Sequence, residues 1–451
     1  MSRTCKLSRA ATGCRGRRHT SVTVDWSVSR LLSRLMSAPA AAPSLRTDAE
    51  IIGLVGLAHG TSHFFHLMLP PLFPWLMRDF SLSYTEAGLL MTVFFVVSGI
   101  GQAIAGFVVD RVGARPVLFF GIALLATSGV LLGLSESYGM LVLTATVAGL
   151  GNSIFHPADF TLLNHRVAAP RLGHAFSVHG LSGNLGWAAA PVFMAGIASV
   201  TDWHVAGFAA AGVGFTVLLI LWLRREVLAD AARGLVAHGD SRETNPTSQL
   251  GFLQSGAVWL CFAFFFLTTA AFGILQNYAP AILGEVYGVS LTMATAGLTA
   301  YLLGSAAGML TGGFLAARSE QNERLIAVAL GLAATTATVI ATGAAAAWML
   351  LPLMTVMGFG VGVAGPNRDL LVRRAATSRF GRAAFGRVYG FVYSGLDTGL
   401  AMSPLLFGPL LDAGRFKEAL ASVAVLQVAA LLTAWRVGSS ARAVQSQERH
   451  A

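Results

Sequence analysis

Long apolar stretches separated by short polar breaks recur along the sequence from Ile51 onward. A helix needs about 20 mostly apolar residues to cross a bilayer, and twelve stretches of this sequence reach that length. We expect them at about 51–77, 84–109, 115–134, 139–164, 174–198, 203–223, 255–283, 290–317, 324–344, 348–372, 385–411 and 416–436. The chain is 55% hydrophobic and 12% charged, whereas soluble domains are about 25% charged. The pattern therefore predicts an all-α membrane protein in a lipid bilayer.

A polar stretch that is rich in arginine and contains the helix breaker Pro246 divides the twelve expected spans into six and six. We therefore expect a basic N-terminal extension, a first six-helix bundle, a cytoplasmic linker, a second six-helix bundle and a cytoplasmic tail. Their ranges are 1–50, 51–224, 225–250, 251–437 and 438–451. The extension is interpreted either as a disordered or targeting segment, or as the product of a start codon upstream of Met36.

The two halves of the chain repeat each other. Glycine and proline recur at equal spacing in the fourth and tenth spans, and a set of four positions recurs in the fifth and eleventh. The matching pairs are Gly149 with Gly358, Pro157 with Pro366, Gly173 with Gly386, Asn184 with Asp397, Gly186 with Gly399 and Pro191 with Pro404. Repeated halves that enclose a site near the bilayer midplane are typical of secondary transporters. The repeat predicts two pseudo-symmetric bundles.

Arginine and lysine gather in alternate loops. The loops expected on one side of the membrane hold most of them, and the other side has only Arg78, Arg415 and Lys417. The positive-inside rule then predicts that both termini and the linker lie in the cytoplasm. Topology and anionic lipid explain the net charge of +10, so we expect no nucleic-acid partner.

The loop after the second span carries Gly106, Asp110, Arg111, Gly113 and Arg115. Its charges cannot rest in hydrocarbon, so the loop must lie at the membrane surface. The two glycines permit a close approach of helices and a tight turn. The pattern G-x-x-x-D-R-x-G-x-R in this position resembles the signature of the major facilitator superfamily of secondary transporters.

That resemblance implies the major facilitator fold. It also implies that Asp110 binds across the interface between the halves, so that Asp110, Arg111 and Arg115 act in conformational gating and do not touch substrate. The second-half copy of the loop has Ala317 where the first has the aspartate. We therefore expect the gating contacts of the two halves to be asymmetric.

The first span carries His59, His63 and His66. Offsets of four and seven residues place them on one helix face, which is expected to point into the bundle. Four interpretations remain open: proton carriers, protonated ligands of an anionic substrate, neutral ligands of a divalent metal, or hydrogen-bonded packing groups. Because no cysteine and no carboxylate within this helix completes a site, we expect no metal and no cofactor.

The fourth span contains the run His156-Pro157-Ala158-Asp159. Proline frees a backbone carbonyl and bends a helix, which is typical of a segment that lines a cavity. Asp159 is interpreted either as a functional carboxylate or as the partner of an arginine at the membrane interface.

Asp397 falls near the middle of the eleventh span, between Gly395 and Gly399. A carboxylate at that depth should be buried or line a cavity, and we hypothesise that it takes up and releases the coupling proton. Arg368, next to Asp369, is interpreted as a lock between the halves, as the start of a loop, or as a ligand of an anion. The other polar candidates within apolar spans, which suggest a small polar substrate, are Gln102, Asn152, His179, Asn184, Gln276, Asn277, Tyr278 and Tyr301.

Several short motifs, most of them in the first half, resemble the fosmidomycin-resistance type of bacterial efflux transporter. They are Ser62-His63-Phe64, Phe80-Ser81-Leu82-Ser83, Gln102 followed by the Asp110 loop, the run Gly149 to Pro157, and Gly183-Asn184-Leu185-Gly186 with Pro191. The resemblance implies proton-coupled export, across the inner membrane of a bacterium, of a small molecule such as a phosphonate. The sequence departs from that group by having Ala158 directly after Phe-His-Pro, and His66 and Leu67 where an acidic residue can follow Ser-His.

Taken together, these patterns predict a monomeric alternating-access transporter that uses protons to export a small polar or anionic compound. An importer of a small carboxylate or a metal chelate on the same fold is the first alternative. A membrane-embedded metal-dependent enzyme is the second, and we expect that the protein is not an enzyme because no motif has suitable spacing for one.

Overall fold

The computed structural model describes residues 44–229, 251–319, 321–380 and 385–450, and every regular element within them is a helix. The predicted all-α class is therefore confirmed. The expected extension up to residue 43 and most of the expected linker, 230–250, lie outside the described residues, as do the side chains of Asp110 and Asp369.

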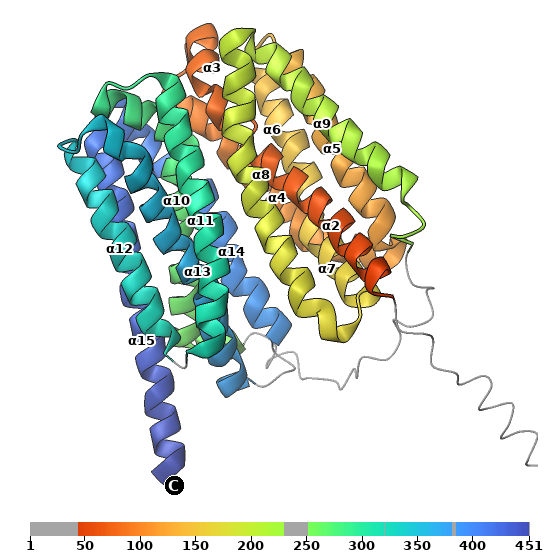
Figure 1. Cartoon of the computed structure of the whole chain (residues 1–451), viewed down its shortest axis with the longest axis vertical. Helices are drawn as coiled ribbons and strands as arrows, with labels where there is room; N and C mark the ends of the chain where they lie inside the picture. Colours follow the sequence, from red (N-terminus) through yellow and green to blue (C-terminus); the bar gives the residue numbers. More distant parts are fainter. Residues whose placement is uncertain (1–43, 230–250, 320, 381–384, 451) are drawn as a thin grey trace, which may run out of the picture. The chain divides into compact units, whose positions relative to one another are not determined.

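The first half of the chain forms a bundle in which α2 packs on α8, α5 on α9 and α4 on α6. Figure 1 shows these helices gathered on one side, in red to yellow-green. The elements are α2 (Leu45–His66), η1 (Pro70–Leu72), α3 (Phe73–Phe80), α4 (Tyr84–Val112), α5 (Ala114–Gly133), α6 (Tyr138–Asn152), α7 (Phe155–Arg166), η2 (Ala169–Arg171), α8 (Leu172–Val200) and α9 (Trp203–Leu223).

The second half forms the other bundle, in which α11 packs on α13, α10 on α14 and α15, and α12 on α13 and α15. It is drawn in green to blue in Figure 1. The elements are η4 (Gly251–Gln254), α10 (Gly256–Tyr287), α11 (Leu291–Arg318), α12 (Asn322–Thr342), η5 (Ala347–Met349), α13 (Leu350–Phe380), α14 (Phe385–Asp412) and α15 (Phe416–His450).

Eleven helical stretches within the described residues are long and apolar enough to cross a membrane. The remaining expected span, 385–411, coincides with α14. Two expected spans are interrupted. The first one breaks after His66, where Pro70 and Pro71 start a new turn, because proline cannot donate a helical hydrogen bond. The fourth one breaks between Asn152 and Phe155, so the proline motif begins a new helix instead of bending one.

Glycines set the closest helix contacts in both bundles. A Cβ atom added at Gly358 of α13 would overlap the carbonyl oxygen of Tyr301 in α11. The matching position in the first half, Gly149 of α6, packs in the same way against the carbonyl of Phe94 in α4. Small residues let two backbones approach closely where no side chain could fit. The repeat of glycines found in the sequence therefore marks equivalent helix crossings.

The main contacts between the bundles are those of α4 with α14 and of α8 with α11, and η1 also packs on α10. In the first pair the chains run in opposite directions, because Thr85 lies against Gly408 while Gly99 lies against Asp397. We call the end of the unit that holds the loop at Gly113 the gate-loop end. The opposite end, where α3 ends and α4 begins, is the far end.

Candidate functional site

Five histidines and one aspartate from three helices of the first bundle lie together. They are His59, His63 and His66 of α2, His156 and Asp159 of α7, and His179 of α8. Asp159 is fully buried, His59 and His179 are 2% and 5% exposed, and His156 is exposed. All six were predicted as candidates, and the fold brings all six into one cluster, which we call the histidine cluster.

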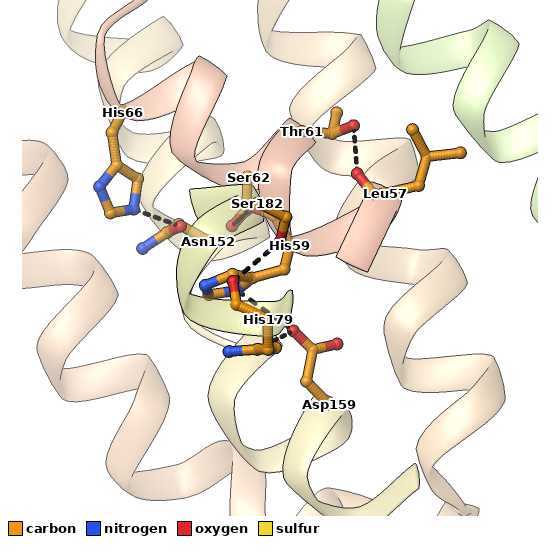
Figure 2. Close-up of polar contacts among 9 residues, drawn as sticks. All are labelled: Leu57, His59, Thr61, Ser62, His66, Asn152, Asp159, His179 and Ser182. Atoms are coloured by element: carbon orange, nitrogen blue, oxygen red, sulfur yellow. Dashed lines mark hydrogen bonds and ion pairs between the residues drawn. The ribbon is translucent and has the colours of Figure 1, made fainter. Parts of the chain in front are cut away.

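The carboxylate of Asp159 lies between two imidazoles. Its Oδ2 atom is 3.0 Å from Nε2 of His179 and 3.3 Å from Nδ1 of His59, as the dashed lines in Figure 2 show. The interpretation of Asp159 as the partner of an arginine is therefore wrong, because in the folded chain its partners are these two histidines. The rings of His59 and His179 are also stacked, with centroids 3.5 Å apart.

His66 is held at the other end of the cluster by two hydrogen bonds. Its Nε2 atom is 2.7 Å from Oδ1 of Asn152, and Nε1 of Trp187 donates to its Nδ1 atom at 3.3 Å. Indole N–H can only donate, so the proton of this imidazole sits on Nε2. The amide of Asn152 in turn donates to the hydroxyl of Ser98 in α4. Both ring nitrogens of His66 are therefore engaged in hydrogen bonds in this structure.

His63 lies between the two ends and connects them to the second bundle. Its ring centroid is 4.4 Å from that of His59 and 4.3 Å from that of Trp187. Trp187 then contacts Phe272 of α10 at 5.2 Å, and Phe272 stacks on Tyr301 of α11 at 6.0 Å. Sequence reasoning did not single out Trp187. Its spacing of eight residues from His179, close to two helical turns, was the available signal.

The hydroxyl groups near the cluster are already used. Ser62 and Ser182 donate to the carbonyl oxygens of His59 and His179, three residues back in their own helices, and Figure 2 shows both. Asn184, another predicted candidate, donates to its own helix and to the sulfur of Met309 in α11. Asn184 therefore lies at the interface between the bundles, outside the histidine cluster.

Asp397 of α14 faces the other bundle. Its carboxylate lies beside Gly99 of α4, at the point where the two helices meet near the middle of their length. Within the described residues it has neither a hydrogen-bond donor nor an ion-pair partner. The guanidinium of Arg368 in α13 lies 4.1 Å above the ring of Phe265. The predicted carboxylate is thus half-buried at the interface.

The polar candidates of α10 and α11 do not share one cavity. Gln276 is fully buried and both of its amide atoms lack a hydrogen-bond partner. Asn277 donates to the carbonyl of Gly273 and lines a cavity of about 520 Å³ at the far end, together with Tyr278 and Glu285. Tyr301 is buried in the α11 and α13 contact.

The gate loop ends α4 at Gly113, whose φ of 101° is one that L-residues rarely adopt. The expected turn is confirmed there. A Cβ at Gly106, in contrast, would meet nothing within 4 Å, so no helix approaches it in this conformation. The side chain of Arg111 is exposed, and Arg115 donates to the carbonyl of Arg225 at 3.2 Å.

At the far end, a carboxylate of the second bundle caps a helix of the first. Asp412, the last residue of α14, accepts hydrogen bonds from the backbone N–H of Tyr84 at 2.6 Å and of Thr85 at 3.1 Å. The hydroxyl of Thr85 donates to it as well, at 2.5 Å. The hydroxyl of Tyr278 adds a bond from α10 to the carbonyl of Tyr84 at 3.0 Å. We call this set of contacts the far-end latch.

With the fold and these contacts in view, comparison with known proteins defines the class. Residues 55–404 match the model of the Major Facilitator Superfamily. The chain belongs to this superfamily of transporters, and it is not an enzyme. A bacterial homologue of the human lysosomal transporter Spinster, solved in an inward-facing and unoccupied conformation, superposes with a TM-score of 0.68 at 16% identity. It covers 89% of this chain and 98% of its own.

Among curated proteins, the chain is similar to the fosmidomycin resistance protein of Escherichia coli K12, with 27% identity over 61% of this chain and 67% of that protein. It also resembles the membrane sensor protein UhpC of Salmonella typhimurium, with 26% identity over 53% of this chain and 58% of that protein. The chain thus spans between 58% and 67% of the length of these two relatives.

Proposed function

We propose that this protein is a proton-coupled antiporter that exports a small polar or anionic compound, drug-like or phosphonate-like, by alternating access. The observation that carries the proposal is Asp397, a half-buried carboxylate without a partner among the described residues, set on α14 against Gly99 of α4. These two helices join the bundles. A carboxylate at this interface is exposed to water from one side of the membrane or the other as the two bundles move relative to each other.

The far-end latch closes one side of that interface. Helices α4 and α14 are in contact from Asp412 and Tyr84 at the far end to Gly99 and Asp397 near the middle. Between these points, the hydroxyl of Thr92 donates to the carbonyl of Ala401 at 2.8 Å. Access to Asp397 in this state therefore comes from the gate-loop end. The arginines of that end favour a cytoplasmic orientation, so this conformation is the inward-facing one of a monomer in the bacterial inner membrane.

The direction of coupling follows from this arrangement. When the far end opens, Asp397 takes a proton from outside, and a neutral carboxylic acid can return through the low-dielectric interface at little cost. When the gate-loop end opens, the proton leaves to the cytoplasm and the site is ready for cargo. Proton entry and cargo exit then alternate on one interface.

Two features favour a polar or anionic cargo. Near its interface the first bundle presents imidazoles, in His156 and His63, and its one cluster carboxylate, Asp159, is fully enclosed. A lipophilic cation needs an accessible carboxylate, whereas an anion is bound by imidazolium and amide donors. The curated relative named for fosmidomycin resistance supports the same class of cargo.

The test uses the full chain in proteoliposomes with an imposed pH gradient, first against a panel of phosphonates, antibiotics and organic acids at two external pH values. With an active cargo in hand, Asp397→Asn should lose gradient-driven transport while cargo exchange at equal pH persists. Ser394→Ala is the matched control, because Ser394 is exposed on the same helix and bonds only to its own backbone. Gradient-driven transport at the wild-type rate in Asp397→Asn would refute the role of Asp397.

The rival function is import of a small carboxylate or a metal chelate, because the fold is compatible with both directions. Accumulation assays separate the two. An exporter loads inverted membrane vesicles and lowers the cargo content of whole cells, whereas an importer does the opposite in both preparations.

A further inference from the structure

The buried part of the histidine cluster has a composition that the proton-coupled mechanism at Asp397 does not use. His59, His156 and His179 each offer one ring nitrogen, and these three atoms lie within 4.8 Å of one another. Asp159 adds a carboxylate oxygen 3.0 Å from the His179 nitrogen and 3.3 Å from the His59 nitrogen. Three imidazoles thus converge from α2, α7 and α8, and a carboxylate borders two of them; both are donor types that borderline metal ions prefer.

These separations suit a tetrahedral ion. With metal–ligand bonds of about 2.0 to 2.2 Å, the donors of a tetrahedral site lie roughly 3.3 to 3.6 Å apart. The distances from Asp159 to His59 and His179 are already near this range. His156 is the exposed member of the set, and its ring already lies 5.5 Å from that of His59, so a rotation of its side chain would bring it to the other donors.

Unused donor capacity gives a second, independent indication. Oδ1 of Asp159 is a buried atom with no hydrogen-bond partner, although it can coordinate a metal, and Nδ1 of His59 has only its 3.3 Å ion-pair contact with Oδ2 of Asp159. Leaving such an atom unpaired costs about 1 to 3 kcal/mol, and more when it is charged. Glycine at position 183 leaves the space that His59 and His63 occupy, because a Cβ there would come within 3.0 Å of both rings.

We propose that His59, His179 and Asp159, completed by His156, form a binding site for one divalent transition-metal ion of the zinc class inside the first bundle. The expectation of no metal was based on the absence of a carboxylate from the first span. The fold removes that objection because α7 brings Asp159 against α2. A bound ion ties α2, α7 and α8 together, and α8 makes one of the main contacts with the second bundle.

The test reads metal binding directly and needs no transport assay. The full chain is purified in detergent with a tag free of histidine, stripped with a chelator, and titrated with Co²⁺ and Zn²⁺. Wild-type protein should take up one ion per chain, with the intense visible absorption that Co²⁺ shows in tetrahedral sites. Zn²⁺ should displace it. Sub-stoichiometric binding, or the weak spectrum of hydrated octahedral Co²⁺, would overturn the proposal.

Variants assign the ligands. Asp159→Asn and His179→Ala should each weaken Co²⁺ binding by more than about 10-fold, and gel filtration with a thermal melt shows whether each variant is folded. His174→Ala is the matched control, because His174 is exposed on the same helix as His179. Unchanged affinity in a folded Asp159→Asn protein would also refute the site. Metal binding is measured without a proton gradient, so a negative result would not affect the proposed role of Asp397. In the same way, a negative transport result for Asp397→Asn would not affect the metal site.

Discussion

Removing the carboxylate of Asp412 should shift the transporter toward a state that is open at the far end. This carboxylate accepts three hydrogen bonds from the first turn of α4, two from backbone N–H groups and one from the Thr85 hydroxyl. Helix α4 does not depend on them for its own stability, because Ser83 and Glu86 already form a capping box within the first bundle. The Asp412 contacts therefore hold the two bundles together more than they hold the helix.

The size of the shift follows from these contacts. Loss of a capping side chain costs about 0.5 to 2 kcal/mol, and a negative charge at a helix N-terminus contributes about 0.3 to 1 kcal/mol at an exposed site. Both energies include part of the same interaction between the carboxylate and the helix N-terminus, so they do not add in full. We expect a total of about 1 to 2 kcal/mol. This changes the ratio of open to closed molecules by roughly 5- to 30-fold. Asp412→Asn keeps one acceptor oxygen and should give a smaller shift than Asp412→Ala.

Pulsed electron spin resonance can measure the populations. Spin labels at Glu136 and Ala344, exposed in far-end loops of the first and second bundle, report the opening of that end when the three native cysteines are replaced by serine. Asp412→Ala should increase the fraction of long distances.

Asp202→Asn is the matched control, because Asp202 also caps a helix with its carboxylate, accepting from the N–H of His204 at 2.7 Å, but within one bundle. That bond holds the pKa of Asp202 below the usual range of a carboxyl group. The cap formed by Asp202 is therefore fully present above the ordinary carboxyl pKa, and it is lost only when the pH falls through the lowered pKa. At neutral pH, therefore, the Asp202 cap is intact in the control protein. Identical distance distributions for wild type and Asp412→Ala would refute the latch.

Two further outcomes follow from single contacts. Tyr278→Phe removes the hydroxyl that donates to the carbonyl of Tyr84. It should shift the spin-label populations in the same direction as Asp412→Ala, by a free energy of about 0.5 to 1.5 kcal/mol. A shift toward the closed state would contradict this prediction. Gly358→Val forces a side chain against the carbonyl of Tyr301 and should lower thermal stability in detergent by about 1 to 3 kcal/mol. Gly331→Val, which has open space around its Cα, is the control, and equal melting of the two variants would show that the crossing is not tight.

Much of the fold follows from local patterns. Span length and hydropathy predict the helices, because each segment that crosses the bilayer must by itself be long enough and apolar enough to do so. The glycine and proline repeat gives the two halves because equivalent crossings need small residues at equivalent depth, as Gly149 and Gly358 do. The break at Asn152 was harder to predict, because a proline in a span can either bend a helix or begin a new one.

The partners within the site could not be predicted in the same way. Periodicity places His59, His63 and His66 on one face of α2, but it does not tell which neighbouring helix that face meets. Asp159 was therefore assigned to an arginine or left open, although its partners are histidines of α2 and α8. Asp412 was missed because a carboxylate at a helix end is indistinguishable in sequence from an ordinary loop charge.

The far-end latch also gives a reason for the asymmetry of the gate loops. Helices α4 and α14 are antiparallel, so the C-terminal end of each points toward the end of the interface where the other begins, and the dipole of a helix N-terminus attracts an anion. Asp412 occupies that place at the far end. Asp110 lies in the last turn of α4, which ends at Val112 at the gate-loop end, and the superfamily resemblance implies that it binds across the interface there. Each carboxylate would then hold shut the end at which it lies.

Two such latches must oppose each other. Asp412→Ala should favour opening of the far end, and Asp110→Ala should favour opening of the gate-loop end. In the double variant the two effects should cancel to within about 0.5 kcal/mol, because sites at opposite ends of a helix pair are far enough apart to act independently. A second spin-label pair at Asn164 and Ser319, at the gate-loop end of each bundle, completes the measurement. If both single variants open the same end, the two carboxylates do not form an opposing pair.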